Sequence, residues 1–219
     1  APPVAAPSIE IKIGHVGPLT GQIAHLGKDN ENGAQLAIDE ANGASIKIDG
    51  KDVKFVLIAE DDQADPKVGT TVAQKLVDAK VAGVVGHLNS GTSIPASPLY
   101  NGAGIPVISG SATNPKLTEQ GFKTQFRVVG RDDQQGPAIA SYLAANNKPK
   151  TVAVIDDATA YGEGLANEVE KTLKAAKIAV LPREKGTDKT TDWKAVLTKL
   201  TGALKPGGTI IEGTSGNTG

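Results

Sequence analysis

Two short runs of small, mostly hydroxyl-bearing residues carry the chemistry that this sequence suggests. The first is residues 89–93 (Asn-Ser-Gly-Thr-Ser) and the second is residues 109–113 (Ser-Gly-Ser-Ala-Thr). Each follows a short apolar segment rich in β-branched residues, which is typical of a buried parallel strand. In an open α/β sheet, ligands collect at the carboxyl ends of strands, where helix N-termini attract anions. Hydroxyl and N–H groups there would hold a small carboxylate without a cationic side chain.

The flanking pattern predicts the elements that must position these runs. Val81 to Leu88 and Ile105 to Ile108 are predicted as neighbouring strands because they are short and β-branched. A short helix is expected from the first run to about Ala103. Asn114-Pro115 after the second run signals another helix start.

Strand and helix patterns alternate along the rest of the chain. We expect strands at 9–16, 54–59, 124–129, 151–156, 178–181 and 209–212, and helices at 29–41, 66–79, 132–145, 162–176 and 193–204. This alternation predicts an α/β fold with doubly wound parallel sheets. A composition break at 121–130 suggests a crossing between two lobes. The expected divisions are a flexible lead (1–8), lobe 1 (9–122) and a partial lobe 2 (123–219) with an atypical tail from about 201.

Composition limits the classes of function. The 219 residues carry a net charge of −1, which gives no sign of binding to nucleic acid or to an anionic membrane. No apolar run approaches the roughly 20 residues of a transmembrane helix. The chain has no cysteine, so it has neither a disulfide framework nor a cysteine-ligated zinc site. The Pro-rich start, residues 1–8, is typical of a secreted chain after signal-peptide removal, although an artificial boundary would look the same.

Several stretches together resemble the periplasmic leucine/isoleucine/valine-binding proteins, the solute receptors of ABC importers. The resemblance covers about residues 9–200, and its matching stretches are 17–21, 61–67, 86–97, 108–118, 131–137 and 161–166. It implies a type I periplasmic-binding-protein fold whose second lobe is incomplete here. It also implies capture of a small aliphatic amino acid by closure of two lobes, an ABC permease as partner, a periplasmic location, and neither catalysis nor a cofactor.

The same resemblance assigns roles to individual residues. Ser90 and Thr113 would donate hydroxyl hydrogen bonds to the ligand's α-carboxylate, while the Ser111 carbonyl would accept from its ammonium group. Ala112 would line the same wall, and Tyr161 would close over the ligand from lobe 2. The alternative is that these hydroxyls only cap helices, as Ser and Thr after strands often do.

Some positions depart from the family pattern. The family often has a cysteine pair where this chain has Ala64 and Asn89, so that bridge is absent. An aromatic residue often stands where Leu26 falls, so the ligand's side-chain pocket is expected to differ and the exact amino acid is left open.

Other residues that could do chemistry have plainer interpretations. His15, His25 and His87 are scattered and lack metal-ligand spacing, and the first and last are interpreted as structural histidines at strand ends. The carboxylates at 61–62 and 132–133 are interpreted as loop residues. No Gly-x-Ser-x-Gly elbow supports a hydrolase.

The tail is similar to a different family. Residues from about 204 to 219 resemble the strand and phosphate loop of cysteine synthase-type enzymes, which use pyridoxal phosphate. The matching loop residues are Thr214, Ser215, Gly216, Asn217 and Thr218. The segment that carries the Schiff-base lysine in those enzymes is missing. Three hypotheses stay open: a working amino-acid receptor, a fragment related to such an enzyme, and a truncated or chimeric chain that binds nothing. An incomplete lobe 2 further predicts self-association through exposed apolar surface.

Overall fold

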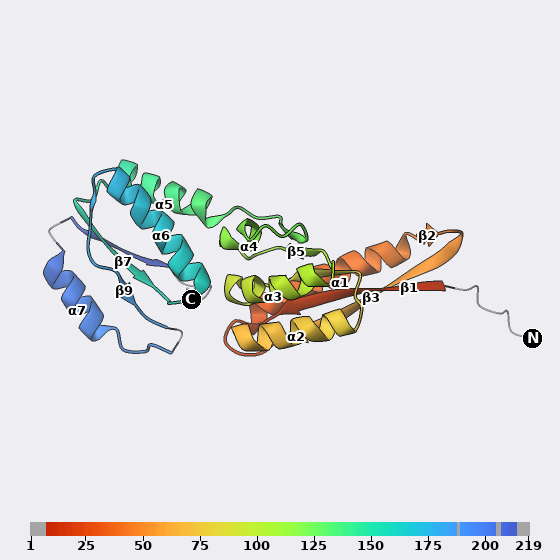
Figure 1. Ribbon diagram of the computed structural model, residues 1–219. Coiled ribbons are helices and arrows are strands. Elements are labelled where there is room, and N and C mark those ends of the chain that lie inside the picture. Colours follow the sequence, from red (N-terminus) through yellow and green to blue (C-terminus); the bar gives the residue numbers. More distant parts are fainter. Residues whose placement is uncertain (1–7, 188, 205–206, 214–219) are drawn as a thin grey trace, which may run out of the picture. The chain divides into compact units, whose positions relative to one another are not determined.

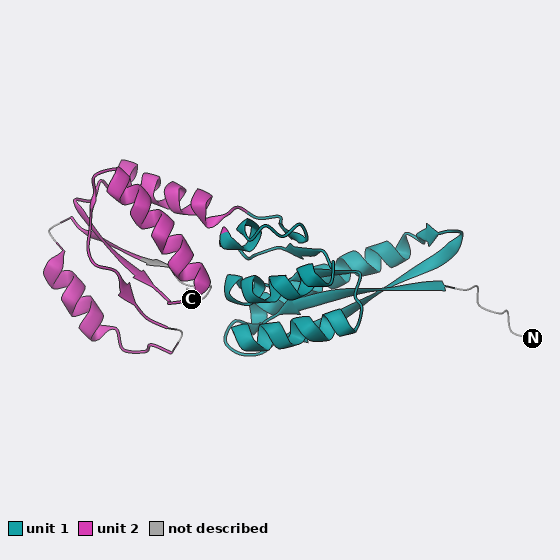
Figure 2. Cartoon of the chain, viewed as in Figure 1, with its two compact units in different colours: residues 1–112, 116–129 teal, residues 113–115, 130–219 magenta. Residues whose placement is uncertain are grey.

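The computed structural model describes residues 8–187, 189–204 and 207–213. The chain forms two compact units, which Figure 2 shows in different colours. Unit 1 consists of residues 1–112 and 116–129, and unit 2 of residues 113–115 and 130–219. The lobe boundaries expected from the sequence stay a prediction.

Unit 1 is built on a six-stranded sheet with the order β2-β3-β1-β4-β5-β6. Its strands are β1 (Ser8–Gly17), β2 (Lys47–Ile48), β3 (Lys51–Asp61), β4 (Gly83–Gly86), β5 (Val107–Ser109) and β6 (Gln125–Arg127). Neighbouring strands are parallel except β2 and β3, which form an antiparallel hairpin. The parallel register brings the carboxyl ends of the central strands to one edge of the sheet.

Four helices accompany this sheet (Figure 1): α1 (Ala24–Gly43), α2 (Pro66–Asp78), α3 (Ser90–Gly102) and α4 (Lys116–Glu119). The predicted start of α2 is confirmed, because the Asp65 carboxylate accepts from the backbone N–H groups of Lys67 (2.7 Å) and Val68 (3.1 Å). The unit 1 core joins the sheet to α2 and α3 through buried residues that include Val16, Leu76, Val84, Ala96 and Tyr100.

Unit 2 has a smaller parallel sheet. Its strands are β7 (Thr151–Asp156), β8 (Ala179–Val180), β9 (Glu184–Lys185) and β10 (Thr209–Gly213), and its helices are α5 (Asp132–Asn146), α6 (Ala160–Ala175) and α7 (Lys194–Ala203). β7 pairs with the other three strands.

Every residue of β7 is buried, because helices cover both of its faces. Val152 and Val154 join a core cluster with residues of α5 and α6, whereas Ala153 and Ile155 join a second cluster with Leu200 of α7. Alternate residues of β7 therefore face helices on opposite sides of the sheet, which confirms the predicted doubly wound architecture for this strand. Within the described ranges, no helix has the length and apolar character needed to cross a membrane.

Element boundaries differ from the sequence expectation where the backbone has special geometry. β4 is shorter than the predicted strand because its last residue, Gly86, has a φ of 137°. A Cβ atom at Gly86 would lie 2.4 Å from the carbonyl oxygen of Val16, so only glycine fits there. The helix start signalled by Asn114-Pro115 is confirmed, because α4 begins at Lys116. The two-residue strands β2 and β9 have no counterpart among the expected elements.

Candidate functional site

The two hydroxyl-rich runs begin at the same edge of the unit 1 sheet. Val84 and Val85 of β4 pair with Val107 and Ile108 of β5, so the loops after these strands start side by side. Hydrogen bonds join the loops directly: the Ser109 hydroxyl donates to the His87 carbonyl (2.9 Å), and the Ser111 hydroxyl donates to the Leu88 carbonyl (2.8 Å). The runs therefore form one connected surface at the end of the sheet.

Several of these hydroxyls have structural roles. The Ser93 hydroxyl donates to the carbonyls of Asn89 (2.8 Å) and His87 (3.1 Å), and the Thr92 hydroxyl donates to Asn89 (3.2 Å). The Ser109 hydroxyl also accepts from the backbone N–H of Ala112 at 2.9 Å. For Thr92, Ser93, Ser109 and Ser111, the hydroxyl is thus engaged in holding the loops.

Thr113 behaves differently from its neighbours. Its residue is 8% exposed, and its side-chain Oγ1 is buried without a hydrogen-bond partner among the described residues. The side-chain oxygen of Asn89, the residue before α3, is in the same state, and Asn89 does not cap the helix. Buried polar atoms without partners are uncommon, so each calls for a ligand or a water molecule.

Ala112 and Leu26 both lie in unit 1. Ala112 is buried, and its carbonyl accepts from Arg127 Nη1 at 2.9 Å. Leu26 is half-buried in the first turn of α1. One turn later, the Asn30 side-chain oxygen would lie 3.6 Å from a Cβ placed on Gly110, so the start of α1 adjoins the loop after β5.

Hydrogen bonds join the end of β3 to the loop before α1. Asp61 accepts from the Leu19 N–H (2.8 Å) and from the Thr20 hydroxyl (2.5 Å). Partial burial by itself raises the pKa of Asp61, but these hydrogen bonds and that from the Gln63 N–H outweigh it, so the pKa is lowered. Asp61 therefore has a structural role, but as the last residue of β3 and not in the expected loop, whereas its neighbour Asp62 is fully buried.

Sequence reasoning missed a buried polar cluster beside the candidate loops. The His87 ring contacts the Tyr100 hydroxyl, and its other nitrogen faces the Asp62 carboxylate. The residues are far apart in the sequence, and Tyr100 lies in a helix whose spacing suggests only a core position. Nothing in the sequence alone would have joined these three residues.

Within unit 2, the segment that holds Thr113 contacts the start of α6, where Tyr161 lies. The Asn114 side-chain amide donates to the Ala160 carbonyl at 2.7 Å, which links the 113–115 segment to the start of α6. Tyr161 is half-buried there, and burial, together with the carboxylates of Asp132 and Asp157, raises the pKa of its phenol. Tyr161 is thus neutral at physiological pH and able to donate a hydrogen bond.

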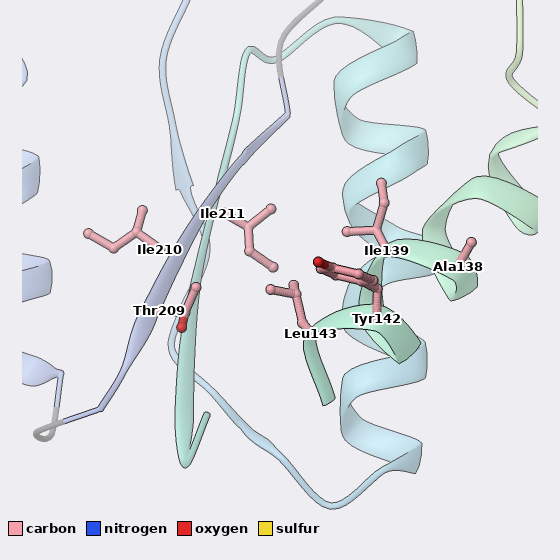
Figure 3. A pocket seen from close by; sticks show the side chains of 7 residues that line it. All are labelled: Ala138, Ile139, Tyr142, Leu143, Thr209, Ile210 and Ile211. Carbon is pink, nitrogen blue, oxygen red and sulfur yellow. The ribbon is translucent and has the colours of Figure 1, made fainter. Parts of the chain in front are cut away.

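A separate apolar hollow lies in unit 2 between α5 and β10 (Figure 3), with a volume of about 560 Å³. It is lined by Ala138, Ile139, Tyr142, Leu143, Thr209, Ile210 and Ile211. β10 is the end strand of the described sheet. The Tyr142 side chain points into the hollow from α5, opposite Ile211 of β10.

Two further expectations concern cofactors and metals. The proposed phosphate-loop residues 214–218 lie outside the described residues. Among the residues that the structure describes, no three His, Cys, Asp or Glu side chains gather in a way that would hold a metal ion.

Comparisons with known proteins identify the family. The family model described as periplasmic binding protein matches residues 10–208. The leucine-, isoleucine-, valine-, threonine- and alanine-binding protein of Pseudomonas aeruginosa is 42% identical over 142 residues, which are 64% of this chain and 38% of that protein.

Two solved structures show the same fold. The branched-chain amino acid transporter substrate-binding protein LivJ from Streptococcus pneumoniae, in complex with isoleucine, matches with a TM-score of 0.76 and 32% identity over 89% of this chain and 54% of that one. A solute-binding protein of an ABC transporter from Rhodopseudomonas palustris BisB5, in complex with 3,4-dihydroxybenzoic acid, matches with a TM-score of 0.74 and 26% identity over 89% and 52% of the two chains.

This chain spans about half the length of these solved relatives. The family model covers most of the sequence, and the fold agrees with it over both units. The chain therefore belongs to the periplasmic binding protein family.

Proposed function

We propose that this chain binds a small aliphatic amino acid and serves as the periplasmic receptor of an ABC importer. The observation that carries the proposal is the buried Thr113 hydroxyl, which has no partner among the described residues although neighbouring hydroxyls do. An unpartnered buried hydroxyl costs about 1–3 kcal/mol. A bound carboxylate would remove this cost and form charge-assisted hydrogen bonds.

The proposed ligand contacts follow the family resemblance. The Ser90 hydroxyl and the Thr113 hydroxyl and N–H would bind the carboxylate, and the Ser111 carbonyl would bind the ammonium group. Further contacts would come from Leu26, Asn89, Ala112 and Tyr161. The burial of Ser90 and Ala112 supports this assignment, because charge-assisted hydrogen bonds are stronger away from water.

Relatives with different ligands set the choice of compounds to test. One solved relative holds isoleucine and another holds 3,4-dihydroxybenzoic acid, and both ligands carry a carboxylate. An amino acid is favoured here because a backbone carbonyl, such as that of Ser111, suits an ammonium group that a benzoate lacks.

Isothermal titration with leucine, isoleucine, valine, alanine and 3,4-dihydroxybenzoate tests the proposal. We expect saturable binding of at least one amino acid and loss of that binding in a Ser90→Ala, Thr113→Val double variant. Thr71→Val is the matched control, because this exposed hydroxyl of α2 bonds only within its own helix. A folded chain that binds none of the amino acids would contradict the proposal and favour a chain that keeps the fold without the function.

The cysteine synthase-like tail supports a competing proposal, a fragment related to a pyridoxal-phosphate enzyme or a chimera carrying its loop. Its predicted strand is present as β10, parallel to β7. The missing Schiff-base lysine argues against catalysis, so we propose a binding role and no enzymatic one. Titration with pyridoxal phosphate, followed by visible absorbance, separates the two: saturable uptake would favour the tail proposal.

Self-association is a further part of the proposal. Ile210 of the end strand β10 is 36% exposed, and Tyr142 of α5 is 66% exposed. An open strand edge with apolar residues favours pairing between chains. We expect light scattering to show dimers or larger species at high concentration. Ile210→Lys should shift them toward monomer, and a wild-type chain that stays monomeric would contradict this part.

A further inference from the structure

His87 lies at the centre of a buried polar cluster in unit 1. Its Nε2 is 3.0 Å from the Tyr100 hydroxyl, and its Nδ1 is 3.3 Å from Asp62 Oδ2. The His87 and Tyr100 rings meet edge to face, with centroids 5.8 Å apart. All three residues are at most 1% exposed. Because these three polar side chains are shielded from water, their interactions with one another hold them in a defined geometry.

The partners of the His87 ring are themselves fixed. The Asp62 Oδ1 atom accepts from the Ala64 N–H (3.0 Å), and the Asp62 N–H donates to the Gly17 carbonyl (3.1 Å), so the carboxylate cannot swing away. Burial, with the nearby carboxylates of Asp62 and Glu60, raises the pKa of Tyr100, so its phenol keeps its proton. The contact between the Tyr100 hydroxyl and His87 Nε2 takes its direction from the tautomer of the ring. With the ring proton on Nδ1, facing Asp62, the phenol donates to Nε2.

The backbone of the same residue holds the candidate loops. The His87 carbonyl accepts from the hydroxyls of Ser93, at the start of α3, and Ser109, at the end of β5. Ser109 in turn accepts from the N–H groups of Ala112 (2.9 Å) and Ser111 (3.3 Å). One residue thus connects the acidic loop after β3, α3 and both loops of the candidate site.

We propose that His87 is a positioning residue, which Tyr100 and Asp62 hold so that its carbonyl keeps residues 88–90 and 109–112 in their ligand-binding geometry. This inference rests on the proposed function for the identity of the ligand, but not for the positioning itself. His87 would not touch the ligand. Removing the Tyr100 hydroxyl should therefore loosen the loops without opening the core, since phenylalanine fills the same space.

The test compares Tyr100→Phe with wild type in two measurements. The first is residue-resolved hydrogen exchange without ligand, which measures the exchange rate of the Ala112 amide. This amide donates to the Ser109 hydroxyl, which in turn bonds to the His87 carbonyl. Titration with leucine, isoleucine, valine and alanine reports affinity. We expect exchange at Ala112 to rise and affinity to fall, each by about fivefold to tenfold, the effect of one lost hydrogen bond. The His87 ring ¹⁵N shifts should move from the Nδ1–H tautomer pattern toward a mixture of tautomers.

Val84→Ala in β4 is the matched control, because it removes buried apolar volume beside the cluster without touching a polar contact. It should lower stability while leaving Ala112 exchange and affinity within twofold of wild type at temperatures where both chains are folded. Unchanged Ala112 exchange in Tyr100→Phe, or an equal effect of Val84→Ala, would overturn the inference. If wild type binds no amino acid, the proposed function fails, and the exchange measurement alone still decides whether His87 positions the loops.

Discussion

Asn42 of α1 and Phe55 of β3 exchange two hydrogen bonds: the Asn42 amide donates to the Phe55 carbonyl (3.0 Å), and its oxygen accepts from the Phe55 N–H (2.8 Å). β3 pairs along its length with β1 on one side, but on the other side it pairs with only two residues of β2. The Asn42 side chain therefore takes the place of a neighbouring strand for one residue of β3, and it fixes the end of α1 to the sheet.

Replacing Asn42 with alanine should lower the free energy of unfolding of unit 1 by about 1–2 kcal/mol, because two backbone groups lose their partners. Urea titration monitored by hydrogen exchange of β1 and β3 peptides measures this. Gln35→Ala is the control: its exposed amide bonds only to Asp39 in the same helix, so a change below about 0.5 kcal/mol is expected. Equal effects of the two substitutions would contradict the prediction.

His15 in β1 predicts a pH dependence of unit 1 stability. Burial lowers the pKa of His15, with the Glu31 carboxylate acting in the opposite direction. As the pH falls below the unfolded value of about 6.5, the unfolded chain gains a proton that the folded chain does not, so stability falls by up to about 1.4 kcal/mol per pH unit.

Unfolding free energies of unit 1 measured between pH 7.5 and pH 5 should show this decline. His15→Gln should flatten the slope even if it lowers stability overall. A His15→Gln chain with the wild-type slope would assign the pH dependence to other groups.

The sequence predicts the fold best where burial is continuous. β7 has the predicted bounds because Thr151–Asp156 is an uninterrupted buried run. The predicted strand at 81–88 is twice the length of β4, because hydrophobicity continues past Gly86 while the backbone does not. α1 begins at Ala24, five residues before the predicted start, and its first turn includes buried Gly27, which a propensity argument excludes from a helix.

Arg183 binds two acidic residues of unit 2 at once. Its Nε lies 2.7 Å from Glu170 of α6, and its Nη1 lies 3.3 Å from the buried Asp156 at the end of β7. Arg183→Met should destabilise unit 2 by about 1–3 kcal/mol, because the Asp156 carboxylate would stay buried without its cation. Lys174→Met removes only an exposed partner of Glu170, so a change of at most about 0.5 kcal/mol is expected.

Fluorescence of Trp193, the single tryptophan, provides the measurement, since this residue packs against the unit 2 core. Urea midpoints for the two variants should differ clearly, with Arg183→Met the lower. Similar midpoints would show that the Asp156 carboxylate finds enough stabilisation from its own loop, where it also accepts from the Ala158 N–H.

For the candidate site, sequence shows which loops meet but not how each hydroxyl is used. The apolar runs before residues 89 and 109 are enough to predict two neighbouring strand ends. Whether Ser109 or Thr113 has a hydroxyl available for a ligand depends on backbone carbonyls such as that of His87, whose position no residue pattern encodes. The roles assigned to Ser90, Ser111 and Tyr161 stay predictions for the same reason.

Thr113 and Ser109 should therefore respond to substitution in opposite ways. Thr113→Val removes a buried hydroxyl that has no partner among the described residues, so stability should be unchanged or rise by up to about 1 kcal/mol, while affinity for the amino acid falls about tenfold or more. Ser109→Ala removes a hydroxyl that bonds to the His87 carbonyl and the Ala112 N–H, so stability should fall by about 1–3 kcal/mol.

Thermal unfolding and isothermal titration on the same samples separate these effects. A protein that gains stability when a polar residue is removed, and loses ligand affinity with it, keeps that residue for binding. If Thr113→Val instead destabilises the chain and leaves binding intact, the hydroxyl has a structural partner and the carboxylate site must lie elsewhere.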